Sequence, residues 1–250
     1  LILLPIFLNS QTVFKDTVNT AINNIVHIQI QNTISPASAS FLKETFKEAN
    51  KHNATLILIQ LDTPGGLATS MREMIQDILN SQIPVVVYVS PKGARAASAG
   101  TYLMYSSHIA VMSPGTNIGS ATPVNLVSTP KQPINPMDKQ NDKEYKKTDI
   151  QDKTALEKKV LNDAIAYIKS IAELRGRNIP WAIQAVKEGK SISAQEALRL
   201  NVIDLIANDI PDLLQKIDGK KIIVNKKVIT INSKNPILIY FEPSWKTKFL

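Results

Sequence analysis

The sequence predicts an α/β fold with a parallel sheet, and three observations support this prediction. Segments 55–61 and 85–89 are almost continuously apolar, as expected for strands covered on both faces. Residues 67–80, between them, carry apolar side chains at helical spacing. Strand-like and helix-like segments alternate along the chain, which is typical of successive βα units with right-handed crossovers.

The first half of the chain divides into short elements with recognisable ends. Ser35-Pro36 provides an N-cap and a first-turn proline, and the turn Pro64-Gly65-Gly66 ends a strand. The expected elements are a strand at 25–30, a helix from Pro36 to about Ala49, a strand at 55–61, a helix at 67–80, a strand at 85–89, a helix opened by the Ser98 segment, and a strand at 109–112.

The second half contains one long helix and several short elements. An apolar stripe from Leu156 to Leu174 indicates a helix that ends at Gly176, and Ser193 with Glu196 forms a capping box. The expected elements are this long helix, helices at 181–187 and 193–200, a strand at 202–206, and a hairpin from 222–224 and 228–231.

Between these halves the periodicity fails. Prolines and then a charged run occupy the region up to about Thr154, which predicts a mobile loop at about 123–154. We therefore expect a main domain at 24–215. Residues 1–23 start with an apolar run typical of a signal-peptide or anchor remnant, and 216–250 form a hairpin and an extension that leads toward a membrane domain.

Composition narrows the function classes. The 250 residues include 29 Lys and Arg against 21 Asp and Glu, a formal charge of +8, but only 6% are aromatic. The stacking platforms of nucleic-acid-binding proteins are therefore not expected. The chain has no cysteine, which excludes disulfides, a thiol nucleophile and cysteine metal ligands. No metal-ligand cluster or cofactor motif is recognised, and the Gly65-Gly66 turn does not complete a dinucleotide-binding G-x-G-x-x-G.

Ser98 is the candidate nucleophile. Small residues surround its hydroxyl in the segment 93–101, so a peptide could approach it closely. Two predicted helix N-termini, at Gly65-Gly66 and at Ser98-Ala99, offer backbone N–H groups that could hold an oxyanion. The alternative is structural: Pro-Gly-Gly is only a tight turn, and the small residues only permit close helix packing.

The residues alone do not decide which side chain acts as the base for Ser98. Of the three histidines, His27, His52 and His108, only His108 is near Ser98 in the sequence, and a histidine at a strand edge is usually a surface or packing residue. A lysine serves as a base when burial lowers its pKa. Lys159 lies on the flank of the long helix's apolar stripe, but its neighbours Glu157 and Lys158 favour a solvated charged turn, and the residues alone do not distinguish it from the other lysines.

Four motifs together resemble the NfeD-type membrane-bound serine proteases, which are related to Clp protease and signal peptide peptidase A. The resemblance covers most of residues 24–245 and is poor at 124–155. The motifs are Leu61-Asp62-Thr63-Pro64-Gly65-Gly66, the 93–101 segment around Ser98, Pro114-Gly115-Thr116-Asn117-Ile118-Gly119-Ser120, and Lys159-x-x-Asn162-Asp163 with its continuation to Asn178.

The resemblance implies a ClpP/crotonase-like fold and a serine endopeptidase with a Ser98–Lys159 dyad. Gly66 and Ala99 are then the oxyanion donors, and Gly65 and Leu67 contact substrate. It also implies cleavage of apolar polypeptide segments, a stomatin-like membrane partner, a homo-oligomer (a dimer), and a membrane-anchored domain on the extracytoplasmic side. Two rival functions remain: a crotonase-like acyl-CoA enzyme that uses the two amides without a nucleophile, and a non-catalytic scaffold for stomatin-like proteins.

Overall fold

The computed structural model describes residues 23–123 and 142–243, with the side chains of 142–154 left undescribed. At its centre is a six-stranded, fully parallel sheet in the order β11-β1-β2-β3-β5-β8. The α/β prediction is therefore confirmed. Its strands are β1 (Asn24–Gln31), β2 (Leu56–Asp62), β3 (Val85–Val89), β5 (Ile109–Met112), β8 (Leu205–Ile206) and β11 (Ile237–Tyr240).

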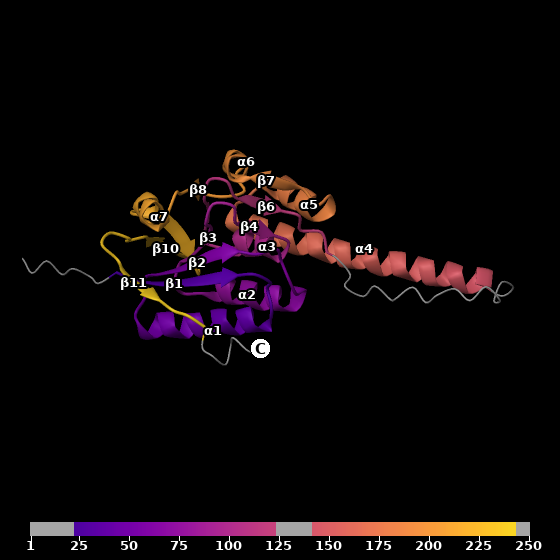
Figure 1. Cartoon of the computed structure of the whole chain (residues 1–250), viewed down its shortest axis with the longest axis horizontal. Coiled ribbons are helices and arrows are strands. Elements are labelled where there is room, and N and C mark those ends of the chain that lie inside the picture. Colours follow the sequence, from indigo (N-terminus) through magenta and orange to yellow (C-terminus); the bar gives the residue numbers. More distant parts are fainter. Residues whose placement is uncertain (1–22, 124–141, 244–250) are drawn as a thin grey trace, which may run out of the picture.

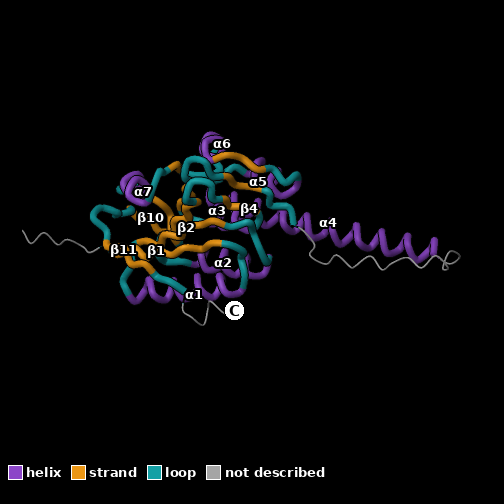
Figure 2. Tube along the Cα trace, in the orientation of Figure 1, coloured by secondary structure: helices purple, strands orange, loops and turns teal. Residues whose placement is uncertain are grey.

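The sheet is the middle layer of the protein, with helices on both of its faces (Figures 1 and 2). Apolar side chains of β1, β2 and β3 point alternately to the two faces and form two separate cores. One core packs against α1 (Pro36–Lys51), α2 (Ala68–Asn80) and α3 (Ala99–Ser106), and the other against α7 (Ile210–Ile217). The strands are therefore buried on both sides, as their continuous apolar runs predict.

A second, small sheet lies beside the carboxyl ends of the main strands. It consists of β4 (Arg95–Ala97), β6 (Asn117–Gly119) and β7 (Ser191–Ser193) in the order β4-β6-β7. Bridges connect Thr63 with Ala96 and Ile34 with Gly66, so the turn after β2 is fastened to both neighbouring segments. This sheet fixes the backbone around Ser98.

The remaining helices follow the predictions closely, apart from the start of α4. Ser35 and Ser193 cap their helices as expected, and Asn178 caps α5. The elements are α4 (Asp142–Arg175), α5 (Ile179–Lys187), α6 (Ala194–Arg199) and the hairpin β9 (Lys221–Val224) with β10 (Lys227–Thr230).

The start of α4 and the place of β11 differ from the sequence predictions. α4 begins at Asp142, well inside the expected 123–154 loop, because 142–154 contains neither proline nor glycine and includes four lysines, a glutamate and a glutamine, which have high helix propensity. The rest of that loop, 124–141, lies outside the described residues. Segment 237–240 is a strand paired with β1, so part of the 216–250 extension belongs to the main sheet. The apolar run at the start of the chain and residues 244–250 lie outside the described ranges.

None of the helices in the described part of the chain, α4 included, combines the length and apolar composition needed to cross a bilayer. The amino-terminal part of α4 instead projects away from the sheet (Figure 1). Its carboxyl-terminal part packs into the core through Ile168, Ile171 and Ala172. One end of this helix is therefore anchored, while the other extends beyond the body of the protein.

Candidate active site

Ser98 stands at the N-cap of α3 in an unusual backbone conformation. Its φ of 53° and ψ of −116° lie in a region that residues with a side chain rarely occupy. Three hydrogen bonds hold it there: the Ser98 N–H and the Thr101 hydroxyl both donate to the Gly119 carbonyl at 2.9 Å, and the Thr101 N–H donates to the Ser98 carbonyl. The small sheet therefore stabilises a strained turn that presents the serine side chain.

The turn after β2 lies directly against this serine. The Thr63 N–H and carbonyl pair with Arg95 and Ala97 of β4, and the Arg95 N–H donates to the Asp62 carboxylate at 3.0 Å. Gly65 has a φ of 118°, and a Cβ on it would lie 2.5 Å from the Cβ of Ser98. Gly65 thus combines two requirements, a left-handed conformation and close approach, that only glycine meets.

Two helix N-termini converge beside Ser98. Ala99 is the first residue of α3, and Gly66 immediately precedes Leu67, the N-cap of α2. Within the described residues, neither N-cap side chain accepts a hydrogen bond from its own helix. The first N–H groups of a helix have no intrahelical acceptor and carry positive partial charge. Both helix ends can therefore stabilise an anion formed near Ser98.

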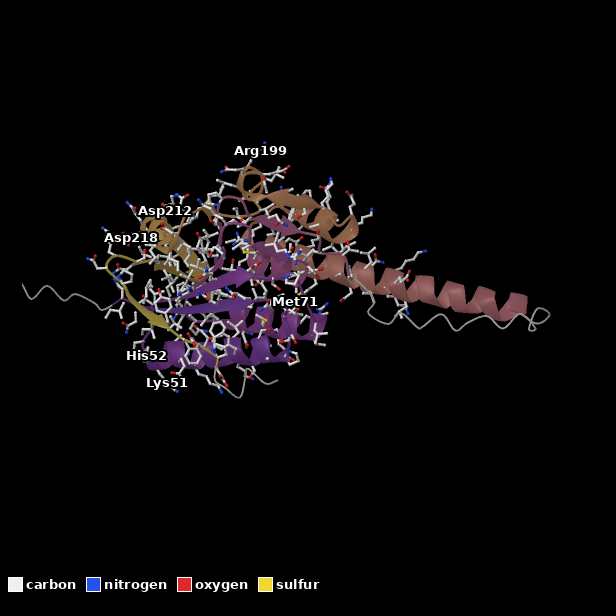
Figure 3. All side chains as sticks on the ribbon, in the orientation of Figure 1. Lys51, His52, Met71, Arg199, Asp212 and Asp218 are labelled. Carbon is white, nitrogen blue, oxygen red and sulfur yellow. The ribbon has the colours of Figure 1, made fainter. Side chains whose placement is uncertain are left out.

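A cavity of about 350 Å³ brings these groups together. Gly66, Leu67, Ser98 and Ala99 line it, as the sequence interpretation of the site requires, and Gly65 lies just behind them against Ser98. Further walls come from α2, α3, α4 and the segment after β6, namely Ala68, Met71, Arg72, Tyr102, Ala121, Pro123, Val160, Asp163, Ala164 and Tyr167. Met71, on the α2 side, is labelled in Figure 3. Most of these side chains are apolar, which suits an apolar segment of a substrate.

Lys159 is exposed in the structure and precedes Val160, the first α4 residue at the cavity. The cavity-facing positions on α4 are 160, 163, 164 and 167, the spacing of one helix face. Lys159 borders that face. The predicted apolar stripe therefore serves two purposes: its middle lines the cavity, and Ile171 packs into the core. Its two ends serve neither purpose, because Leu156 and Leu174 are 58% and 64% exposed.

His108 lies elsewhere, behind α3. Its Nδ1 accepts a hydrogen bond from the Val85 N–H, and its Nε2 is 3.4 Å from Arg175. Burial, together with the charges of Arg175 and Arg177, lowers the pKa of His108 to about 3. A neutral histidine held in this way is a packing residue, which is the reading that the sequence favoured.

Four polar or aromatic side chains at the cavity were given no role at the site from the sequence, although Asp163 and Tyr167 belong to the quoted α4 motif. Arg72 pairs with Asp163 and lies over the Tyr167 ring, whose face stacks with Tyr102 at a centroid distance of 6.1 Å. Burial raises the pKa of both tyrosines, so both rings stay neutral. The helical spacing of Val160, Asp163 and Tyr167 was visible in the sequence, but a partner on another helix was not.

In the described ranges, no group of three or more histidine, aspartate or glutamate side chains gathers in a way that could hold a metal ion. The site as described consists of a hydroxyl, backbone amides, and an apolar cavity with one ion pair. These groups are suited to acyl transfer.

Comparison with known proteins identifies one family and two relatives that agree with each other. The profile of the family described as "NfeD1b, N-terminal domain" matches residues 24–226. The membrane-bound protease PH1510 of Pyrococcus horikoshii is 36% identical over 237 residues, which is 91% of this chain and 48% of that protein. The membrane protein NfeD1b of Bacillus subtilis is 32% identical over 123 residues, 49% of this chain and 28% of that protein. The chain thus spans about half the length, or less, of these relatives.

Two solved structures have the same fold. One is a lysine-to-alanine mutant of the 1510-N membrane-bound stomatin-specific protease in complex with a substrate peptide, with a TM-score of 0.77 and 36% identity, covering 92% of this chain and 96% of that chain. The other is a serine-to-alanine mutant of the same protease, with a TM-score of 0.76 and 36% identity, covering 90% of this chain and all of that chain.

Proposed function

Because the chain belongs to the family of NfeD1b N-terminal domains, we propose that it is the peptidase domain of a membrane-bound serine protease, with Ser98 as nucleophile and Lys159 as base. The observation that carries the proposal is the strained Ser98 beside two helix N-termini in one apolar cavity. A serine that served only in packing would not need this combination of features.

The reaction proceeds through an acyl-enzyme. Neutral Lys159 takes the Ser98 proton as Oγ bonds to the substrate carbonyl carbon, and the N–H groups of Gly66 and Ala99 donate to the resulting oxyanion. The C–N bond then breaks, and the lysine gives its proton to the leaving amine. Water, deprotonated by the same lysine, attacks the ester and releases the second product.

Lys159 must lose water to act as this base. Its side chain is exposed in the structure, and an amine acts as a base only in its neutral form, which burial favours. An apolar peptide segment lying between Leu67, Met71 and Val160 would cover the rim where Lys159 stands. Substrate binding then desolvates the amine and favours its neutral form.

The substrate is a polypeptide with an apolar segment, from a stomatin-like membrane protein. The apolar cavity supports the first part, and the stomatin-specific relative supports the second. The wider proposal is a homodimeric domain that begins at about residue 24, takes β11 of the expected 216–250 extension into its main sheet, and is tethered on the extracytoplasmic face of a membrane. Sedimentation of the purified chain tests the dimer, and protease accessibility in spheroplasts tests the membrane side.

The central test is cleavage of an apolar peptide by wild type, Ser98→Ala and Lys159→Ala, with Lys158→Ala as matched control. Lys158 is the adjacent exposed lysine of α4. We expect both dyad variants to lose at least about 10³-fold in kcat/KM, and the control to retain activity. Mass spectrometry of the wild type should detect an acyl adduct on Ser98.

The outcomes separate the alternatives. Full cleavage by Ser98→Ala would exclude Ser98 as the nucleophile. A crotonase-like acyl-CoA enzyme would cleave no peptide and would keep its acyl-CoA activity in Ser98→Ala, and a scaffold would show no acylation of Ser98. Full cleavage by Lys159→Ala, with loss in Lys158→Ala, would reassign the base.

A further inference from the structure

Arg72 on α2 reaches across the cavity to α4. Its guanidinium forms an ion pair with Asp163 and lies 4.1 Å from the centre of the Tyr167 ring. Asp163 and Tyr167 are one helical turn apart on the face of α4 that lines the cavity. Arg72 therefore connects the helix that begins beside Gly66 with the helix that carries Lys159.

This connection matters because the packing of α4 weakens toward Lys159. Ile168 and Ala172 are fully buried, whereas residues 155–159 are all exposed. Between them, the helix meets the rest of the protein at the cavity wall, where the Tyr102 hydroxyl donates to the Ala164 carbonyl at 3.4 Å. The direction in which the Lys159 side chain points therefore depends on how firmly the rest of the protein holds this turn of α4.

The same ion pair also engages Asp163, which could otherwise pair with Lys159. Residues four apart on a helix are neighbours, so Asp163 lies within reach of Lys159. An unpaired Asp163 carboxylate would attract the lysine along the surface of α4. Arg72 engages that carboxylate from the opposite helix.

We infer that Arg72 is a positioning residue: by holding Asp163 and Tyr167 it fixes the turn of α4 that carries Lys159. The inference rests on the proposed function and adds to it a residue outside the dyad and the oxyanion donors. Arg72 acts through Lys159, and in the structure its guanidinium contacts Asp163 and Tyr167 of α4.

A guanidinium at a cavity wall could alternatively bind the substrate itself. The two roles predict different kinetics. A substrate-binding residue raises KM whether or not Lys159 is present, whereas a positioning residue lowers the acylation rate and has nothing left to position once Lys159 is removed.

A double-mutant cycle with Arg72→Met and Lys159→Ala makes this distinction. The substrate is a p-nitrophenyl acyl ester, whose good leaving group keeps the slow variants measurable. We expect Arg72→Met to lower kcat about tenfold, which corresponds to about 1.4 kcal/mol, with little change in KM. In the Lys159→Ala background the same substitution should have no further effect. Arg72→Lys, which keeps a cation for both partners, should recover part of the rate.

Lys169→Met is the matched control. It removes an exposed cation from another ion pair of α4, Lys169 with Glu173, in which both side chains are 52% exposed. We expect wild-type kinetics from this variant. Asp163→Asn breaks the Arg72 ion pair from its outer partner, which is 70% exposed, but it also removes the carboxylate that competes for Lys159 and keeps the Arg72–Tyr167 contact. We therefore expect a loss in kcat that is smaller than that of Arg72→Met.

Two results would overturn the inference: Arg72→Met kinetics equal to those of Lys169→Met, or an equal loss with and without Lys159. A failure of the proposed function looks different, because cleavage would then be insensitive to Ser98→Ala or Lys159→Ala in the wild-type background. That outcome removes the inference together with the dyad, whereas the first two remove the inference alone.

Discussion

Gly65 packs against Ser98 so closely that a Cβ on the glycine would lie 2.5 Å from the serine Cβ and 3.0 Å from its Oγ. The nucleophile and the turn before α2 therefore share a space that admits no additional atom. The two segments are more than thirty residues apart in the chain, and the Thr63 pairings with β4 bring them together.

Gly65→Ala should displace Ser98 and abolish most activity. We expect a loss of about 10² in kcat/KM, because a misplacement of about 1 Å has an effect of that size. Gly93→Ala is the control, since Gly93 also has a positive φ, 89°, but has nothing within 4 Å of its added Cβ. Equal losses in the two variants would mean that backbone strain, and not contact with Ser98, is responsible.

Ser98→Gly should be more stable than Ser98→Ala by about 1 kcal/mol, because the φ of 53° and ψ of −116° are costly for any residue with a Cβ. Thermal or urea unfolding measures the difference, and both variants should be inactive. Ser170, an exposed position inside α4, provides the comparison, and there alanine should be the more stable by about 1 kcal/mol. The same order at both positions would argue against strain at Ser98.

Stability should decrease as the pH falls below 6.5, in part because of His108. Its pKa is lowered to about 3 in the folded protein, so between pH 6.5 and 3 the unfolded chain binds a proton that the folded chain does not. The contribution of His108 is therefore fully present above pH 6.5 and is lost as the pH falls toward 3. His108→Gln should flatten the dependence of unfolding free energy on pH between about 6.5 and 4.5. Parallel curves for wild type and variant would contradict this.

Asp204→Ala should destabilise the fold by about 3 kcal/mol, because it leaves a buried guanidinium unpaired. The Arg177 side chain is 4% exposed, and its Nη1 donates to Asp204 Oδ2 at 2.9 Å. The same carboxylate accepts the Ala110 N–H at 2.7 Å. Glu188→Ala removes one partner of an exposed pair with Lys190 and should cost less than about 0.5 kcal/mol. Urea unfolding of both variants provides the comparison, and similar costs would mean that burial adds nothing to the Arg177 pair.

The parts of the fold that could be predicted from sequence are those whose signal lies within one segment. Strand 85–89 matches β3, and helix 67–80 differs from α2 by one residue, because a buried parallel strand and an amphipathic helix each repeat a pattern over several residues. Ser35 and Ser193 were recognised as caps because the chemistry of a cap is local.

The parts that could not be predicted depend on distant partners. β4, β6 and β7 have three residues each, too few for a periodic pattern, and they form strands only because they pair with one another. Segment 237–240 fell within the 216–250 extension that was expected to lead toward a membrane domain, although β1 provides its pairing partner. For the same reason, the sequence indicated Ser98 and the two glycines as a site but not the contact from Arg72 to α4.

The pairing of β11 with β1 also decides how the domain bears tension. Because these two strands run parallel, opposite forces applied before residue 24 and after residue 240 act along the strands and not across them. The hydrogen bonds between β1 and β11 would be loaded in shear, all at the same time, and would not open one after another. A chain pulled between its two ends should therefore resist until this strand pair slides as a unit.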